Sequence, residues 1–172
     1  MKKCLILVDC DGTLTDGTVN SKGKGRRFSV IDGYVNNILA NFSRMYEVSF
    51  IIAVVTNSFS SDIEKRCNHL RWEYRPTRDK ESLTRSLVKD IDPAYVVAFG
   101  DDLPDLGMFR FASLYGTPNK SIIAKKHNDT LEDLYITEAV GGQGAFREFI
   151  EGHILYRMSF TETIISNTRS SN

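Results

Sequence analysis

Two aspartates, Asp9 and Asp11, stand one residue apart directly after the apolar run of "LILVDCDGT". Residues two apart on an extended strand project to the same side, so both carboxylates can face one ligand. A carboxylate is already ionised at pH 7 and can attack phosphorus without a partner base, once a cation reduces the charge repulsion. The spacing therefore predicts metal-assisted chemistry on a phosphate.

Two further apolar runs end in polar residues. Thr56 follows the run 50–55, and Asp101 and Asp102 follow the run 95–99 after one glycine. In open α/β sheets, ligands bind outside the carboxyl ends of the strands, so we expect these side chains to converge. Four carboxylates in one crevice repel each other unless a cation lies among them, and ligand sets of oxygen atoms alone favour Mg²⁺.

The runs 4–8, 50–55 and 95–99 are apolar throughout, which is typical of strands buried on both faces of a parallel sheet. Stretches of helical period lie between them, so the pattern predicts an α/β protein, a Rossmann-like three-layer sandwich without a large cap domain. A capping box of Ser61 and Glu64 predicts a helix start after the second run. Further helices are expected at 33–46, 80–89, 104–111 and 144–158. In the last of these, Phe146, Phe149, Ile150 and Ile154 would face the sheet.

Residues 17–30 have a glycine-rich centre between short β-prone pieces, which predicts a β-hairpin projecting from the sheet. Its basic run "KGKGRR", residues 22–27, either binds an anionic substrate or nucleic acid, or is a solvated hairpin tip. "GGQG", residues 141–144, lacks a P-loop lysine and is interpreted as a turn before a helix. We expect one domain at 1–160 and a polar, frayed tail at 161–172.

Composition excludes several classes of protein. Lys plus Arg and Asp plus Glu both total 22, so the zero net charge gives no global attraction to nucleic acid or to anionic membranes. The three cysteines lack metal-ligand spacing and favour reduced, buried thiols in a cytoplasmic protein. No run approaches the roughly 20 apolar residues of a membrane span, and the apolar run at the N-terminus is too short for a signal peptide.

The polar strand ends carry a family resemblance. "DCDGT" at 9–13, Thr56, Lys80 and "GDDLPD" at 100–105 stand in the order of the four motifs of the haloacid dehalogenase superfamily of phosphatases. The chain most resembles the uncapped branch typified by 3-deoxy-octulosonate (KDO) 8-phosphate phosphatase. The pieces "DGTLTDG", "FSVIDGY", "RCNHL", "DDLPDL" and "GGQGAFRE" carry that resemblance to about residue 155.

The resemblance implies a role for each matching residue. Asp9 matches the nucleophile that forms an aspartyl-phosphate, and Asp11 matches the general acid and base. Thr56, Lys80 and the Gly12 amide would bind the phosphoryl oxygens. Mg²⁺ would be held by the Asp9 side chain, the Asp11 carbonyl and Asp101, with Asp102 and Asp105 as closer ligands or in the second shell. The resemblance also implies a homotetramer, with the hairpin packed on neighbouring subunits.

The substrate is less determined by these motifs than the reaction is. Arg66, Asp32 and Gly33 match substrate contacts of the family. Where the octulosonate phosphatases usually have Gly-Arg after the motif threonine, this chain has Asn57 and Ser58. Ile31 and Asn37 likewise replace basic residues that are common in the family. Because arginine holds a carboxylate in a bidentate pair, these departures are expected to weaken or redirect specificity for a sugar acid.

The sequence leaves three hypotheses open. The first is a Mg²⁺-dependent phosphatase acting on a small phosphorylated sugar or sugar acid, similar to KDO 8-phosphate or to a nonulosonate 9-phosphate. The second is a non-catalytic phosphatase-like domain that serves oligomerisation, which the complete motif set argues against. The third is a nucleotide or polynucleotide-end phosphatase, which the zero net charge and the single tryptophan, Trp72, make the weaker alternative.

Overall fold

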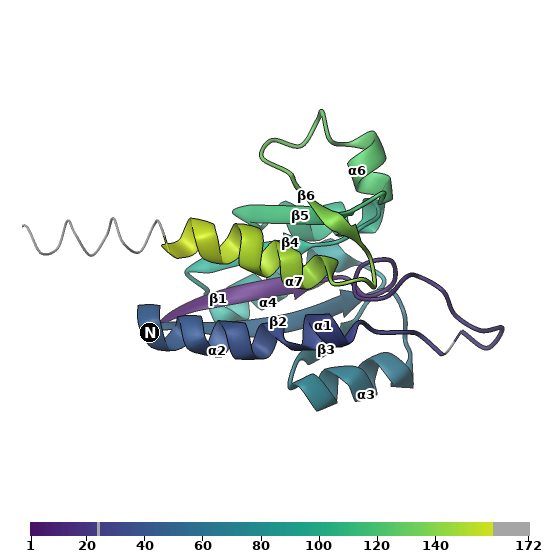
Figure 1. Ribbon diagram of the computed structural model, residues 1–172, viewed down its shortest axis with the longest axis horizontal. Coiled ribbons are helices and arrows are strands. Elements are labelled where there is room, and N and C mark those ends of the chain that lie inside the picture. The colour runs from purple at the N-terminus through teal and green to yellow at the C-terminus, as the bar shows by residue number, and fades with distance from the viewer. Residues whose placement is uncertain (24, 160–172) are drawn as a thin grey trace, which may run out of the picture.

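Six parallel strands form one sheet at the centre of the computed structural model, which describes residues 1–23 and 25–159 (Figure 1). The order across the sheet is β3-β2-β1-β4-β5-β6, and every strand pair is parallel. The strands are β1 (Lys2–Val8), β2 (Val48–Thr56), β3 (Glu73–Pro76), β4 (Tyr95–Phe99), β5 (Leu114–Asn119) and β6 (Tyr135–Val140). The predicted α/β class with a central parallel sheet is confirmed.

The three strands predicted from apolar runs are the three central ones. Val8 at the end of β1 pairs with Val54 of β2 on one side and with Phe99 of β4 on the other. Strands buried on both faces need continuous apolar sequence, and this is why they were recognisable. The outer strands were missed because polar residues interrupt the apolar residues of the edge strands β3 and β6, and β5 contains Gly116 and Pro118.

Helices cover both faces of the sheet, as Figure 1 shows. The helices α2 (Val35–Tyr46), α3 (Ser61–Leu70) and α7 (Ala145–Phe149) contribute to one apolar core, which includes Phe42, Ile63 and Phe149. The helices α4 (Lys80–Ile91), α5 (Leu106–Phe109) and α6 (Ile122–Lys126) contribute to a second core, which includes Leu87, Met108 and Ile123. The expected three layers are therefore present, with the sheet between two cores.

The predicted sheet-facing side of the last helical segment is confirmed. Phe146, Phe149, Ile150 and Ile154 are all fully buried. The Phe149 ring lies so close to Gly116 that a Cβ there would come within 2.7 Å of the ring, which explains a glycine inside β5. The path differs in one respect from a simple helix over 144–158, because α7 passes into a π-helical turn, η2 (Ile150–Ile154), before a last helical turn to residue 159.

Other helix boundaries differ from the expectation at glycine and proline positions. The expected helix 33–46 is preceded by a separate short helix, α1 (Val30–Gly33), and begins at Val35. The expected helix 104–111 is a 3₁₀ turn, η1 (Leu103–Asp105), followed by α5. The expected helix 80–89 continues to Ile91, so only its end was placed too early.

The predicted capping box at the start of α3 is wrong. Ser60, not Ser61, is the N-cap residue, and its side chain makes no capping hydrogen bond to the helix. The Ser60 hydroxyl donates instead to Oδ1 of Asp62, at 2.5 Å. Asp62 forms an ion pair with Arg26 of the loop 17–30. The start of α3 is therefore held by a contact with a distant segment and not by the predicted local cap.

The loop 17–30 projects beyond the carboxyl ends of the strands (Figure 1). A single antiparallel bridge, between Thr15 and Phe28, closes its base, and its described residues form no strand. The projection agrees with the expected hairpin, whereas the two β-strands expected in it are absent from the described part. The glycines Gly17, Gly23 and Gly25 all have positive φ, which favours a loop over a ladder.

Three remaining expectations concern thiols, the C-terminal tail and membranes. Cys4, Cys10 and Cys67 are free and buried, as predicted. Burial raises the pKa of the Cys67 thiol to about 11 and that of the Cys4 thiol to about 12, so both stay protonated at neutral pH. The predicted tail at 161–172 lies outside the described residues. In the described part of the chain, no helix has the length and hydropathy needed to cross a membrane.

Candidate active site

The carboxyl ends of β1, β2 and β4 meet at one small cavity. Its volume is about 160 Å³, and most of the residues that line it come from the segments directly after these strands. The lining residues are Asp9, Asp11, Thr56, Asn57, Ser58, Lys80, Asp101, Asp102, Pro104 and Asp105. The structure thus brings together all four segments that the sequence motifs singled out.

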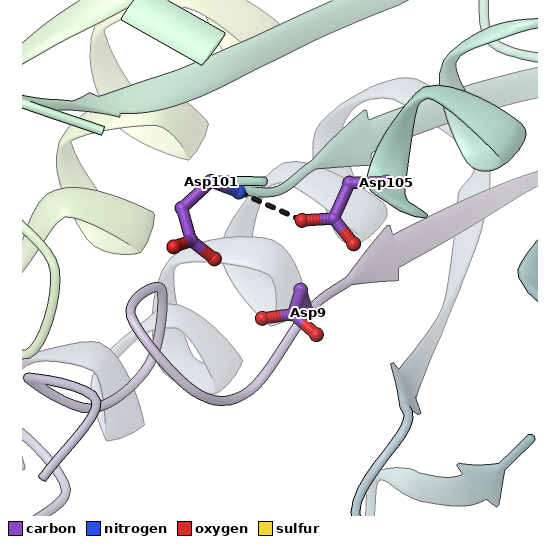
Figure 2. Close-up of side chains that lie close together, drawn as sticks. All are labelled: Asp9, Asp101 and Asp105. Carbon is purple, nitrogen blue, oxygen red and sulfur yellow. Dashed lines mark hydrogen bonds between the residues drawn. The ribbon is translucent and has the colours of Figure 1, made fainter. Parts of the chain in front are cut away.

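Three carboxylates form the acidic centre of this cavity, as Figure 2 shows. Asp9 follows β1, Asp101 follows β4, and Asp105 belongs to η1. One oxygen from each of the three lies within 4.8 Å of the others, close enough to bind one ion. Oδ2 of Asp105 also accepts hydrogen bonds from the amides of Asp101, at 2.8 Å, and Asp102, at 3.1 Å.

The charges of this group require compensation. Burial and the nearby charge of Asp105 raise the pKa of Asp101 to about 6. Burial likewise raises the pKa of Asp9, with a further contribution from Asp105, although Lys80 opposes the shift. Such a cluster of hard oxygen ligands is suited to a divalent cation such as Mg²⁺, which would offset the repulsion. The residues therefore fit the magnesium site that the sequence predicted.

Lys80 is the first residue of α4 and is buried between two of these carboxylates. Its Nζ donates to Oδ1 of Asp9 at 2.5 Å and to Oδ1 of Asp105 at 2.6 Å. Burial alone would lower the pKa of Lys80, but the charges of both aspartates outweigh it and raise that pKa. The side chain of Asp79 accepts a hydrogen bond from the Ser82 amide and so caps the N-terminus of α4. This cap fixes the backbone position from which the Lys80 side chain extends.

The loop after β1 is shaped for close approach to the acidic centre. Gly12 has φ 88°, and a Cβ at this position would overlap the carboxylate of Asp101. The Thr13 hydroxyl donates to Oδ1 of Asp101 at 3.0 Å, a contact that the sequence analysis missed. Thr56 is buried at the end of β2, and its hydroxyl accepts from the Ser58 amide at 3.1 Å.

The "GGQG" turn contacts the backbone of this loop, and the sequence did not predict this contact. A Cβ on Gly141 would overlap the carbonyl of Gly12. The amide of Gly142 donates to the carbonyl oxygen of Thr13 at 3.1 Å. The glycines thus allow two backbone segments far apart in the sequence to touch, and the only sequence signal was the pair of adjacent glycines.

Asp11 reaches the cavity in a different environment from Asp9. Its carboxylate accepts hydrogen bonds from Ser58, at 2.8 Å, and from the guanidinium of Arg26 in the loop 17–30. The basic run containing Arg26 had been interpreted as an anion-binding segment or a solvated tip. In the structure, this arginine is instead bound to the chain's own carboxylates.

The remaining predicted residues lie in different places. Asn57 and Ser58 line the cavity, whereas Asp32, Gly33 and Arg66 are not among its lining residues. Oδ1 of Asp32 accepts from the amide of Arg147 at 3.0 Å, and Arg66 lies against Gly33 and Phe28. Burial raises the pKa of Asp32 to about 6. A substrate-binding role for these three residues stays a prediction.

Asp102 and Asp105 differ in their position relative to the group of three carboxylates. The carboxylate of Asp102 accepts from the Leu103 amide at 2.7 Å and caps η1. It lines the cavity but is outside the group of three carboxylates, which instead includes Asp105. The expected metal ligation by Asp102 and by the Asp11 carbonyl stays a prediction.

Comparison with known proteins gives solved structures with the same fold. No family model matches the chain. A hypothetical protein from Xanthomonas campestris is 28% identical, with a TM-score of 0.73 over 95% of this chain and 87% of that chain. A haloacid dehalogenase superfamily (subfamily III A) hydrolase structure from Legionella pneumophila is 25% identical, with a TM-score of 0.71 over 94% of this chain and 88% of the other.

A third similar structure contains magnesium, phosphate and KDO. The KDO 8-phosphate phosphatase of Moraxella catarrhalis, in complex with magnesium, phosphate and KDO, is 26% identical, with a TM-score of 0.72 over 95% of this chain and 91% of that chain. The sheet and the acidic cavity therefore define a haloacid dehalogenase-type phosphatase, a hydrolase of phosphoric monoesters. Within that class, the chain resembles the KDO 8-phosphate phosphatases.

Proposed function

We propose that the chain is a Mg²⁺-dependent phosphatase of small phosphorylated sugars or sugar acids, with Asp9 as its nucleophile. One observation carries the proposal: the buried carboxylate of Asp9 lies at the carboxyl end of β1 beside Lys80, Asp101 and Asp105. A pair of buried carboxylates around one lysine is costly to maintain, and clusters of this kind are typical of functional sites.

In the proposed first step, an Asp9 oxygen attacks phosphorus in line with the ester bond. The bond from Asp9 to phosphorus forms while the bond from phosphorus to the ester oxygen breaks. Asp11 gives its proton to the departing oxygen, so the product is a neutral alcohol. In the second step, Asp11 takes a proton from water, which attacks the aspartyl-phosphate and releases inorganic phosphate and free Asp9.

The chain's own groups would bind the phosphoryl oxygens. Lys80 already lies 2.5 Å from Asp9, and the Thr56 hydroxyl and the Gly12 amide are on the segments that surround the cavity. Donors fixed before the substrate binds stabilise developing charge without reorganisation. Mg²⁺, when bound to the carboxylate group, would reduce the repulsion between the nucleophile and the phosphate dianion.

Two polar residues that line the cavity support the proposed substrate class. Asn57 and Ser58 present an amide and a hydroxyl there, and Oδ1 of Asn57 is buried without a hydrogen-bond partner. Among the described lining residues, Lys80 is the one cation, and it is bound to Asp9 and Asp105. The unpaired amide oxygen of Asn57 suits a hydroxyl group of a sugar. The similarity to an enzyme solved with KDO supports the sugar-acid alternative, for which another part of the assembly must supply a cation.

We further infer a cytoplasmic homo-oligomer, with a tetramer as the resemblance implies. The loop 17–30 extends from the sheet, and Val19 at 45% exposure and Val30 at 69% place apolar surface on it. Such surface is suited to contact with another copy of the chain. Light scattering of the purified protein measures the subunit number directly.

An assay of phosphate release tests the proposed function. The substrates are KDO 8-phosphate, hexose 6-phosphates, nucleoside monophosphates and a 3′-phosphorylated oligonucleotide, each with and without Mg²⁺. We expect Mg²⁺-dependent release from a sugar or sugar-acid phosphate, and its loss in Asp9→Asn. The exposed Asp90 on α4 provides the matched control, Asp90→Asn, which should keep full activity.

Other results would point to the alternative hypotheses. No release from any substrate by folded protein would favour the non-catalytic oligomerisation domain. Release from nucleotides or the oligonucleotide alone would favour the nucleotide or polynucleotide-end phosphatase. Full activity in Asp9→Asn would exclude the proposed nucleophile.

A further inference from the structure

We propose that Arg26, in the loop 17–30, is the residue that positions Asp11 for proton transfer. The proposal rests on the function proposed above, because it assigns a task to a residue that acts through the general acid. It accounts for the basic run that the sequence left with two interpretations. Neither anion binding nor a solvated tip describes what Arg26 contacts in the structure.

The contact between Arg26 and Asp11 is a bidentate pair. Nε of Arg26 donates to Oδ1 of Asp11 at 2.6 Å, and one terminal nitrogen donates to Oδ2 at 2.9 Å. Two parallel bonds from a planar guanidinium fix both the place and the plane of the ionised carboxylate, the form in which Asp11 takes a proton. When one oxygen of Asp11 carries the proton that it gives to the leaving group, the bond from Arg26 to the other oxygen keeps the side chain in place. Since Asp11 lines the cavity, its orientation toward the substrate is set by a residue that does not itself line the cavity.

The other donors of Arg26 hold the guanidinium itself in place. The terminal nitrogen that donates to Oδ2 of Asp11 also donates to the Ser58 hydroxyl at 3.2 Å. The second terminal nitrogen donates to the Gly23 carbonyl at 2.9 Å and to Asp62 at 3.2 Å. The five N–H groups of an arginine thus all have partners, and the side chain is only 5% exposed.

Asp62 is the second carboxylate that holds the guanidinium of Arg26. It stands in the first turn of α3, and its Oδ1 accepts from the Ser60 hydroxyl at 2.5 Å and from the Ile63 amide at 3.0 Å. The guanidinium therefore lies between two carboxylates, one after β1 and one on α3. This arrangement ties the loop 17–30 to the body of the domain beside the cavity.

The same contacts argue against direct substrate binding by Arg26. Its one positive charge faces two carboxylates, and it has no donor left for an anion on the substrate. A substrate anion could gain this arginine only by displacing a buried, charge-assisted pair. Arg26 is therefore a positioning residue that acts through Asp11, and its loss should affect proton transfer more than binding.

First-turnover rates with two phosphate esters test this role. 4-Nitrophenyl phosphate releases a phenolate that leaves without a proton, whereas the alkoxide of glycerol 2-phosphate needs one. In Arg26→Gln, we expect phosphorylation by glycerol 2-phosphate to slow about 10²-fold, which is the lower end of the range for general acid catalysis. The burst of nitrophenolate from 4-nitrophenyl phosphate should slow much less. The KM values should stay close to those of the unsubstituted protein.

Two further variants separate positioning from a merely structural role. In an Asp11→Asn background, Arg26→Gln should slow glycerol 2-phosphate no further, because its effect passes through Asp11. Arg26→Lys keeps the charge but lacks the planar guanidinium, so its rate with glycerol 2-phosphate should lie between those of the unsubstituted protein and Arg26→Gln. This variant also tests the proposal if Arg26→Gln fails to fold. Arg27→Gln, a change at the exposed neighbouring arginine, is the matched control and should have no effect.

The outcomes distinguish this inference from the function on which it rests. Equal slowing of both esters, or additive slowing in the Asp11→Asn background, would show a general structural role and overturn the inference alone. Unchanged rates in Arg26→Gln would overturn it as well. If the unsubstituted protein hydrolyses neither ester nor any sugar phosphate, the proposed function fails first, and the role of Arg26 fails with it.

Discussion

Lys80 donates from its buried Nζ to Asp105 at 2.6 Å while the same nitrogen contacts Asp9. One cation thus compensates two buried carboxylates, one that follows β1 and one that follows β4. Breaking a buried ion pair from one side leaves an uncompensated charge, which typically costs about 3–5 kcal/mol. The lysine is therefore part of the stability of the domain as well as of its site.

Lys80→Ala should lower the free energy of unfolding by about 3 kcal/mol in metal-free protein. Urea denaturation followed by circular dichroism measures this, and Lys89→Ala, at an exposed position of the same helix, is the control. Adding Asp105→Asn to Lys80→Ala should recover part of the loss, because one of the two unpaired charges is removed. Equal stability of Lys80→Ala and Lys89→Ala would contradict the compensation argument.

Mg²⁺ should stabilise the protein more at pH 7.5 than at pH 5. Burial raises the pKa of Asp101 to about 6, so below pH 6 the ion must compete with protons for this carboxylate. Burial also raises the pKa of Asp9, which adds to the competition as the pH falls. The increase in Tm on adding Mg²⁺ should therefore grow as the pH rises through 6 and then level off. An increase in Tm that is independent of pH would place the ion away from Asp101.

Asp32→Asn should remove a pH dependence of stability. The pKa of Asp32 is about 6 in the folded protein and about 3.9 in an unfolded chain, so between these values the folded state binds more protons. Its contribution to the free energy of unfolding is therefore largest below pH 4 and decreases by about 3 kcal/mol as the pH rises through 6.

Denaturation at pH 4.5 and pH 7.5 measures this contribution. The change between the two pH values should be smaller in Asp32→Asn than in the unsubstituted protein. Asp90→Asn, at an exposed position, should retain the full change. The same Asp32→Asn protein tests the predicted substrate role, since a rise in KM without a fall in kcat would indicate lost substrate contact.

Gly141→Ala should reduce activity through the backbone alone. A Cβ on Gly141 overlaps the Gly12 carbonyl, so residues 12 and 13 must move, and a shift of about 1 Å in a catalytic group can cost about 10²-fold. We expect a fall of that size in kcat/KM for 4-nitrophenyl phosphate. Gly23→Ala is the control, because nothing lies within 4 Å of a Cβ there, although its positive φ makes a small loss of stability expected.

The contacts of the site differ in how readable they are from sequence. Asp9, Thr56 and Asp101 were recognisable because each follows an apolar run long enough for a buried strand, and parallel strands end at one edge. Asp102 and Asp105 could not be told apart, because motif spacing does not specify which carboxylate turns inward and which caps η1.

Arg26 and Gly141 depend on tertiary structure and were not assigned to the site. The partner of Arg26 is 15 residues away in a loop whose path no periodicity describes. The role of Gly141 appears only when β6 is placed at the far edge of the sheet and the chain returns to the site. That edge strand gave no signal for this return, because Thr137 and Glu138 interrupt its apolar residues.

The contact between Gly142 and Thr13 has a consequence for how the protein is made. The segment that contains Asp9 and Thr13 leaves the ribosome before the glycine turn that supports it, which follows about 130 residues later. At ordinary rates of synthesis, of about 5–20 residues per second, that interval is many seconds. A nascent chain therefore carries Asp9 for many seconds before the loop beside the acidic cavity has its final contacts, and the cavity is complete only after the turn at 141–144 has been made.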